Sequence, residues 1–283
     1  MIQLQNEFIT ATINEAGAEL KSLKYCGVEQ IWEGRPEVWG SSCPLLFPIC
    51  GGLKEDKYLY DGKEYHLQKH GYIRTAPFEV ERADDTFAVF CHRSSIETKK
   101  QYPFDYELRV IYTLQDTTLK IEYEVRNEGD RTMYFSIGSH EGYYTPEGIE
   151  DYDVIFPQKE TISAKVIYGS LISHQEQPIL KDTNVLPLYE KYFIIDALAF
   201  TDLKSRSATL RNRKTGRTIR VDFPDMPYFL IWHKPNSPYI CLEPWDGIGD
   251  RVGSSYQLEE KEGINALEAG KTYRNVHSLT FGE

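Results

Sequence analysis

Hydrophobic and polar residues alternate along much of this chain with a period of two, which is typical of β-strands. Short polar turns interrupt the alternation, as at Asp61-Gly62 between the runs 58–60 and 63–67. An Asp-Gly pair between two alternating runs is the strongest short-range signal of a β-hairpin. Two further hairpins are predicted over residues 108–125 and 209–223.

The pattern contains no long helical period, internal repeat, linker or change of composition. A chain of 283 residues with these features is most simply explained by one fold built from strands. We therefore predict a single domain over residues 1–283. Its class is all-β, a large antiparallel β-sandwich with few short helices.

Two stretches are less clearly patterned. Residues 153–187 show little periodicity, and we expect loops with short strands there. Residues 192–200 are strongly apolar but contain one carboxylate, Asp196. An acid in such a run is either buried with a partner or exposed to a polar cleft.

The stretch from 239 to 250 holds the most informative carboxylate. Alternation over 239–243 places the odd-numbered residues, including Glu243, on one face of a strand. Pro244 has no backbone N–H, so we expect strand pairing to end there. A carboxylate at a strand end beside Trp245, which can stack on a ligand, suits a general base or a sugar site. The alternative is that Glu243 caps the following loop or pairs with an arginine.

Two histidines, His140 and His70, are candidates for a functional role because of the residues around them. His140 follows the small residues Ser136 and Gly138 on one face of a predicted strand, which leaves room in front of its imidazole for a cleft or for a neighbouring sheet. His70 lies four residues after His66, a spacing used by helical zinc motifs. On a strand, however, residues four apart are separated by about 13 Å. We therefore predict no metal site.

Composition and charge restrict the classes of binding partner and the cellular compartment that we expect for this protein. The net charge of −11 and the pI near 5.2 argue against a nucleic-acid partner. We see no signal peptide and no apolar run of about 20 residues that could span a membrane. The five cysteines are scattered, without a Cys-x-x-Cys pair, which favours reduced thiols and a cytoplasmic protein. They are Cys26, Cys43, Cys50, Cys91 and Cys241.

The chain lacks a phosphate loop, a dinucleotide fingerprint and a nucleophile elbow. The remaining candidates for chemistry are two histidines and two carboxylates, which can exchange protons near neutral pH. These residues are His70, His140, Asp196 and Glu243.

Several short motifs, in their order and spacing, resemble the aldose 1-epimerase (galactose mutarotase) family, and within it the shorter LacX-like bacterial branch. The motifs are Phe47-Pro48, Tyr58-Leu59-Tyr60-Asp61-Gly62, His70-Gly71-Tyr72-Ile73-Arg74, Gly138-Ser139-His140 and Leu242-Glu243-Pro244-Trp245. The resemblance covers essentially the whole chain. It implies a galactose mutarotase-like sandwich with a carbohydrate cleft and no cofactor, acting on an aldohexose such as galactose or glucose, as a monomer or homodimer.

The resemblance also implies roles for individual residues. Glu243 matches the family's catalytic base, and His140 matches its general acid. His70 matches a histidine that binds and orients the sugar, and Asp196 matches an acid that holds sugar hydroxyls. Arg74 and Trp245 are expected to contribute to sugar binding.

The chain departs from the family pattern at two places. Gly51-Gly52-Leu53 stands where a sugar-binding arginine is usual, and either Lys54 or Arg74 could substitute for it. Glu141 follows His140 where proline is expected. These departures leave the substrate open.

Three other functions stay in view. The first is a non-catalytic sugar-binding or sensing module, favoured by the missing arginine. The second is a hexose-6-phosphate 1-epimerase, for which Lys54, Arg74 and Arg251 are the available cations. The third, ranked last, is a glycosidase that pairs Glu243 with Asp246 or Asp250.

Overall fold

Tight turns pair neighbouring strands as the sequence predicts. The computed structural model describes residues 1–282. Strands β5 (Lys57–Tyr60) and β6 (Lys63–His66) are joined by Asp61 and Gly62, with φ of 50° and 70°. Positive φ at both central residues is what a two-residue hairpin requires. The two longer hairpins are also confirmed: β9 (Tyr106–Gln115) pairs with β10 (Thr118–Asn127), and β17 (Ser207–Asn212) pairs with β18 (Thr218–Asp222).

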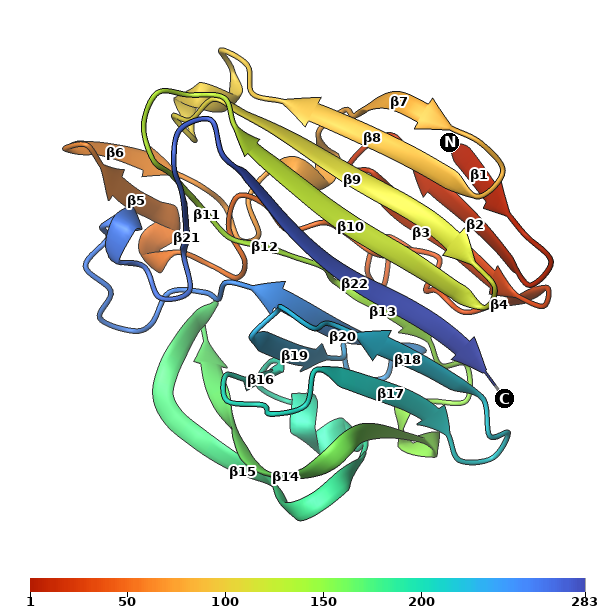
Figure 1. Ribbon diagram of the computed structural model, residues 1–283. Coiled ribbons are helices and arrows are strands. Elements are labelled where there is room, and N and C mark those ends of the chain that lie inside the picture. The colour runs from red at the N-terminus through yellow and green to blue at the C-terminus, as the bar shows by residue number, and fades with distance from the viewer. Residues whose placement is uncertain (283) are drawn as a thin grey trace.

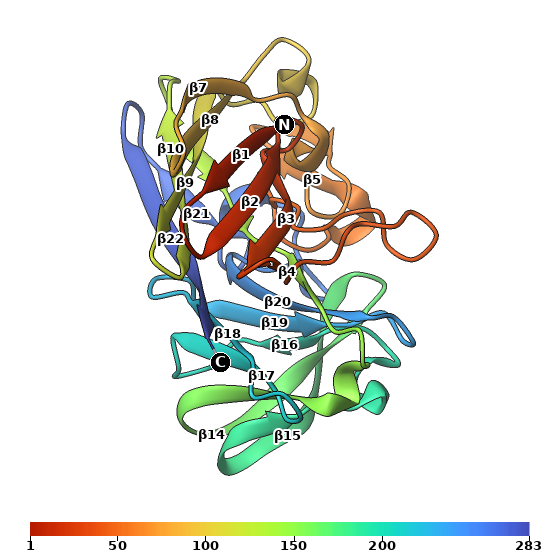
Figure 2. The ribbon, with the colours of Figure 1, turned by 90° about the vertical axis from the view of Figure 1, so that its right-hand side faces the viewer.

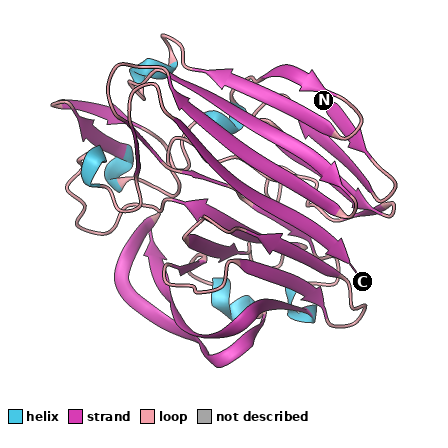
Figure 3. Cartoon of the chain, viewed as in Figure 1, coloured by secondary structure: helices cyan, strands magenta, loops and turns pink. Residues whose placement is uncertain are grey.

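Strands dominate the molecule, and the large antiparallel sandwich is confirmed (Figures 1 and 3). The smaller sheet has four strands in sequential order. They are β1 (Ile2–Gln5), β2 (Ile9–Asn14), β3 (Glu19–Tyr25) and β4 (Val28–Glu29). Along β2 every second side chain is buried, as its sequence alternation predicts.

The larger sheet has the order β12-β20-β19-β16-β14-β17-β18-β22-β10-β9-β8-β7, with β13 beside β20 and β15 beside β14. Its strands are β7 (Glu79–Ala83), β8 (Phe87–Arg93), β9 (Tyr106–Gln115), β10 (Thr118–Asn127), β12 (Ile137–Gly138), β13 (Glu141–Tyr144), β14 (Tyr152–Tyr168), β15 (Leu171–Pro187), β16 (Leu198–Phe200), β17 (Ser207–Asn212), β18 (Thr218–Asp222), β19 (Tyr228–Trp232), β20 (Tyr239–Asp246) and β22 (Thr272–Gly282).

The remaining elements are short. A two-stranded sheet joins β11 (Met133–Phe135) to β21 (Asn265–Leu267). Six one-turn 3₁₀ helices are the described helical elements: η1 (Lys54–Asp56), η2 (Ile73–Thr75), η3 (Thr98–Lys100), η4 (Ile149–Asp151), η5 (Glu190–Phe193) and η6 (Leu258–Glu260). None of them, and no other helix in residues 1–282, is long and apolar enough to cross a membrane.

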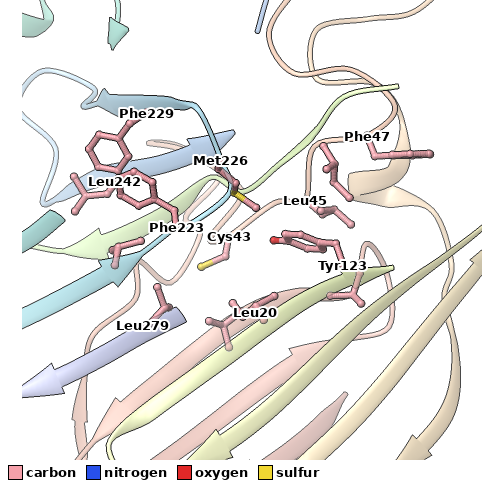
Figure 4. Close-up of a cluster of buried hydrophobic side chains, with 14 of the residues drawn as sticks. Leu20, Cys43, Leu45, Phe47, Tyr123, Phe223, Met226, Phe229, Leu242 and Leu279 are labelled. Atoms are coloured by element: carbon pink, nitrogen blue, oxygen red, sulfur yellow. The ribbon is translucent and has the colours of Figure 1, made fainter. Parts of the chain in front are cut away.

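One apolar core joins the two sheets. Leu20 of β3, Tyr123 of β10, Leu242 of β20 and Leu279 of β22 all belong to it, although they come from distant parts of the chain (Figure 4). The view in Figure 2 shows β1, β2 and β3 lying across the strands of the larger sheet. Burial of these alternating side chains supplies the main driving force for folding.

The prediction for residues 153–187 is wrong. This stretch forms β14 and β15, 17 residues each, which make the long curved hairpin at the bottom of Figure 1. Its register shifts repeatedly between Ile155 and Ile167. Each bulge moves the following side chains to the other face, so the alternation disappears from the sequence while the strand continues.

The expected end of pairing at Pro244 is also wrong. Strand β20 continues to Asp246, and Pro244 lies opposite Phe229 in the ladder with β19. The missing N–H is tolerated because a side chain replaces it, as described below. The predicted alternation in β20 is confirmed: Cys241 packs in a cluster separate from the main core, while Leu242 belongs to that core.

Candidate active site

The register of β20 brings His140 against Glu243. Gly138 pairs with Trp245, and Glu141 pairs with Leu242, so the two pairs belong to one register. The residues between them, Ser139 and His140, therefore lie opposite Pro244 and Glu243. Side chains of directly opposite residues share one face of a sheet and meet closely. His140 Nε2 lies 3.3 Å from Glu243 Oε2.

Pro244 leaves a carbonyl without its usual ladder donor, and Trp245 supplies the replacement. The N–H of Ser139 donates to the carbonyl of Pro244 at 3.1 Å, but Pro244 has no N–H to return the bond. Trp245 Nε1 donates instead to the carbonyl of Ser139 at 3.0 Å. Gly138 makes room for this indole, since a Cβ there would lie 2.6 Å from its Cδ1. The small residues before His140 therefore accommodate Trp245.

A cavity of about 450 Å³ opens in front of the pair. This volume lies within the usual range for small-molecule sites. All six site residues expected from the sequence line it: His70, Arg74, His140, Asp196, Glu243 and Trp245. Asp196 follows η5 in an irregular segment rather than a strand, and it is partly buried.

His70 is held by two hydrogen bonds to one glycine. The backbone N–H of His70 donates to the carbonyl of Gly51 at 2.8 Å, and the imidazole Nδ1 of His70 accepts from the backbone N–H of Gly51 at 3.2 Å. Burial holds the pKa of His70 well below 6.5, and the neighbouring His140, Lys69 and Arg74 act in the same direction. A neutral imidazole that accepts at Nδ1 carries its proton on Nε2. His70 can therefore donate a hydrogen bond from Nε2.

Burial also favours the neutral form of His140. The residue is 9% exposed, and burial lowers the pKa of its imidazole to about 3, with Lys69 and Arg74 acting in the same direction. Its Nδ1 has no hydrogen-bond partner among residues 1–282. The imidazole is thus uncharged at neutral pH unless a ligand or Glu243 supplies a proton.

Glu243 is shifted in the opposite sense. Its side chain is almost fully buried, and burial raises its pKa well above 4.5. Lys69 opposes this shift, whereas the charges of Asp196 and Glu141 reinforce it. Burial thus favours the uncharged form of both members of the pair. Proton transfer over the 3.3 Å contact converts the neutral pair into carboxylate and imidazolium without any change in the number of protons.

Two tryptophans form part of the wall and were missed from the sequence. The rings of Trp39 and Trp232 lie 5.1 Å and 5.6 Å from the His140 ring. Both are partly exposed and line the cavity, so a sugar ring could stack on them. Trp232 lies opposite Cys241, two pairs from Glu243 and on the same face, so its position follows from strand register. Trp39 lies in a loop, for which the sequence gives no signal.

The cations are distributed differently from the sequence prediction. Arg74 lines the cavity, as do Lys69 and Lys234. Lys54 instead lies over the ring of Tyr256, and Arg251 is paired with Glu262 through two contacts. Neither Lys54 nor Arg251 lines the cavity. Lys54 therefore does not replace the missing arginine.

The segment that stands where the arginine is usual is closely packed, against Gly249 and against the tip of the β14–β15 hairpin. A Cβ on Gly51, whose φ is +72°, would lie 2.6 Å from the Cα of Gly249. A Cβ on Gly52 would lie 2.7 Å from the Cβ of Ser170, at the turn between β14 and β15. Leu53 is buried in the main core. Ser170 lines the cavity at this point.

One group could in principle hold a metal ion. Ligand atoms of His140, Cys241 and Glu243 lie within 4.8 Å of one another. A metal-bound cysteine must be a thiolate. Burial raises the pKa of Cys241 well above its ordinary value, and this residue does not line the cavity. The donor set is therefore poorly suited to a resident metal. His66 lies apart from this group, exposed and beside Glu64.

The acids proposed for a glycosidase are engaged elsewhere. Asp246 accepts a hydrogen bond from Tyr273 at 2.5 Å, and Asp250 accepts one from Lys261 at 3.0 Å. Neither acid lines the cavity with Glu243. This arrangement argues against the paired-carboxylate alternative.

Known proteins resemble the chain over its whole length. Residues 1–280 match the family model for aldose 1-epimerase. The plasmid-encoded Protein LacX of Lactococcus lactis subsp. lactis is 34% identical, with 99% of each chain covered. A galactose mutarotase related enzyme from Lactobacillus acidophilus is 34% identical and superimposes with a TM-score of 0.94, covering 100% of this chain and 97% of its own. A galactose mutarotase-like protein from Lactobacillus casei ATCC 334 is 29% identical, with a TM-score of 0.93 and both chains covered completely.

These relatives agree with the fold. The family match spans residues 1–280, the part of the chain that contains the whole cavity lining. The chain belongs to the aldose 1-epimerase family.

Proposed function

We propose that this protein is an aldose 1-epimerase that interconverts the α and β anomers of a free hexose. The observation that carries the proposal is the buried contact between His140 Nε2 and Glu243 Oε2, 3.3 Å long, in the wall of the cavity. An acid and a base side by side can move one proton onto a substrate and another away from it.

The reaction follows from this pair. Glu243, as the carboxylate, takes the proton of the anomeric hydroxyl, while His140, as the imidazolium, protonates the ring oxygen. The hemiacetal opens, the aldehyde carbon rotates, and the ring closes on its other face to give the opposite anomer. Positioned acid–base groups of this kind contribute about 10²- to 10⁴-fold in rate.

Other cavity residues would hold the sugar. His70 donates from Nε2 to a sugar oxygen, and the partly buried carboxylate of Asp196 accepts from sugar hydroxyls. The partly exposed rings of Trp39 and Trp232 offer apolar faces for the pyranose. Trp245 is only 3% exposed and has its N–H committed to Ser139, so it contributes shape to the cavity floor.

Polarimetry on freshly dissolved α-galactose and α-glucose tests the proposal. The expected result is a faster approach to anomeric equilibrium than in buffer, in proportion to the protein added. Sugar binding without any acceleration would instead establish the non-catalytic binding module.

A second candidate, a hexose-6-phosphate 1-epimerase, is favoured by one observation. The side chains of Lys69 and Arg74 line the cavity and form no ion pair or hydrogen bond with other side chains in residues 1–282. Unpaired cations in a protein of net charge −11 suit an anionic ligand. If this candidate holds, glucose 6-phosphate or galactose 6-phosphate is epimerised with a lower KM than the free sugar. Lys69→Met would then raise KM for the phosphate esters and leave KM for the free sugars unchanged.

A further inference from the structure

Glu141 is a buried acid directly beside a catalytic-site histidine. The side chains of Ser139, Glu141 and His277 are almost fully buried. Because side chains alternate along a strand, Ser139 and Glu141 point to the face opposite His140. They therefore lie behind the cavity wall, on the side of the main core.

These three residues form a continuous hydrogen-bonded chain. Ser139 Oγ donates to Glu141 Oε2 at 2.7 Å, and Glu141 Oε1 lies 2.9 Å from His277 Nε2. His277 belongs to β22, where it pairs with Ile121 of β10 and stacks on Tyr123 at 5.7 Å. The carboxylate thus joins the residues on both sides of His140 to the middle of the larger sheet.

The backbone at His140 needs such support. Strands β12 and β13 are interrupted at Ser139 and His140, and the carbonyl of Ser139 depends on an indole N–H in place of a ladder bond. The Ser139 N–H donates to the carbonyl of Pro244. The hydrogen bond that Ser139 Oγ donates to the Glu141 carboxylate restrains the backbone on both sides of His140.

We propose that Glu141, held by Ser139 and His277, is a positioning residue that fixes His140 against Glu243 from the opposite face of the strand. The kinetic part of this inference rests on the proposed epimerase function. The structural part does not. It also gives a physical role to the acid that stands where the family pattern has proline.

The charge of Glu141 provides a signature that packing alone would not give. Burial is the main cause of the raised pKa of Glu243, and Glu141 raises it further, together with Asp196 and against Lys69. The Glu141 carboxylate contacts His277 and is surrounded by five further titratable groups. Burial is the main cause of the raised pKa of each of these five, and the charge of Glu141 raises it further. They are Cys43, Tyr112, Tyr123, Tyr143 and Cys241.

The test compares Glu141→Gln with Glu160→Gln. Gln at 141 keeps the size of the side chain but removes its charge. Glu160 is a matched control: a buried acid that accepts from Ser205 Oγ at 2.7 Å and does not line the cavity. Titration of the Glu243 carboxyl by ¹³C NMR, assigned with Glu243→Gln, needs no substrate. It remains informative if the protein proves not to be an epimerase.

The expected results differ between the two variants. In Glu141→Gln the titration of Glu243 moves to lower pH, and kcat falls roughly 10-fold while KM changes less than about twofold, because Glu141 does not touch the cavity. Glu160→Gln leaves the titration and kcat at wild-type values. An unchanged Glu243 titration in Glu141→Gln, or the same shift in both variants, would overturn the proposal.

A second pair of variants keeps the test decisive if Glu141→Gln does not fold. His277→Gln retains an N–H donor for Glu141, whereas His277→Leu removes it. The first should keep kcat within about threefold of wild type, and the second should lose roughly 10-fold. Equal losses in both would show that the bond to Glu141 has no positioning role.

Discussion

The histidine–carboxylate pair behaves as one titrating unit rather than as two separate groups. His140 and Glu243 lie 3.3 Å apart in a buried wall, and burial shifts their pKa values in opposite directions. Strongly interacting groups lose their protons in steps that belong to the pair. When the pair holds one proton, that proton lies either on Glu243 or on His140. In both arrangements one group can act as an acid and the other as a base, and the proposed reaction needs this one-proton form.

This property predicts the pH dependence. The pKa of His140 is lowered to about 3, and that of Glu243 is raised well above 4.5, so the one-proton form extends from about pH 3 up to the raised pKa. The value of kcat/KM should show no loss on the acid side down to about pH 5, and should fall on the alkaline side as the last proton leaves. An acid limb between about pH 7 and pH 5 would contradict this account.

Burial of Glu243 also costs stability. Its folded pKa lies above the unfolded value near 4.5, so folding disfavours the ionised form. The cost is absent below pH 4.5 and grows as pH rises toward the folded pKa, at about 1.4 kcal/mol for each unit of difference. Glu243→Gln should therefore raise Tm at pH 8 by about 2 °C or more, but not at pH 4. Glu160→Gln, which weakens a buried hydrogen bond, should lower Tm at both pH values.

At the scale of elements, the β14–β15 hairpin completes the cavity. Its turn places Ser170 against Gly52 and Gly249, and a Cβ on Gly52 would lie only 2.7 Å from the Cβ of Ser170. The carbonyl of Gly52 accepts from Asp250, whose own carbonyl accepts from Ile172 at 2.8 Å, so the hairpin is fastened just beyond its turn. The hairpin tip thus packs against Gly52, one of the residues that stand where the sequence resemblance expects an arginine.

A substitution tests this arrangement. In Gly52→Ala the new Cβ would lie 2.7 Å from the Cβ of Ser170, so the hairpin tip must move away from the cavity. Overpacking of this kind costs about 1–3 kcal/mol of stability. We expect KM for the sugar to rise several-fold with a smaller change in kcat, measured by steady-state polarimetry.

The double variant Gly52→Ala/Ser170→Gly provides the control. It removes the Cβ that the alanine meets, and glycine suits the φ of +74° at position 170. In the double variant, KM should fall back most of the way to the wild-type value, and most of the lost stability should be regained. If Gly52→Ala alone leaves KM unchanged, the hairpin does not shape the sugar site.

Elements were predictable from sequence wherever alternation is uninterrupted. The turn at Asp61-Gly62 and the strand 239–243 follow from local chemistry, and both are confirmed. The long hairpin was missed because its bulges change the face of successive side chains. Pairing through Pro244 was missed because a distant indole N–H compensates for the proline, and no local pattern reveals this.

At the scale of the whole molecule, residues far apart in sequence meet in one cavity. The convergence of His70, His140, Asp196 and Glu243 was expected only from the family resemblance, since spacing along the chain does not bring them together. Lys69 was missed although it precedes His70, because which way its side chain faces depends on the turn that His70 adopts at φ +69°. The loop carrying Trp39 has no sequence pattern of its own.

The charge distribution gives a prediction at this scale. The molecule carries a net charge of −11, yet Lys69, Arg74 and Lys234 line the cavity. For a neutral hexose, KM should be unchanged between about 0.02 M and 0.5 M salt. For a hexose 6-phosphate bound through these cations, KM should rise with salt as the charges are screened. Parallel KM measurements on glucose and glucose 6-phosphate distinguish the two substrates.

The measurement that tests the central claim most directly is polarimetry on α-galactose and α-glucose with wild type, Glu243→Gln and Glu160→Gln in parallel. The account predicts that wild type and Glu160→Gln accelerate the approach to anomeric equilibrium, whereas Glu243→Gln loses about 10²- to 10⁴-fold of the rate. A folded Glu243→Gln variant that retains the wild-type rate, or a wild type that does not exceed buffer on either sugar, would contradict it.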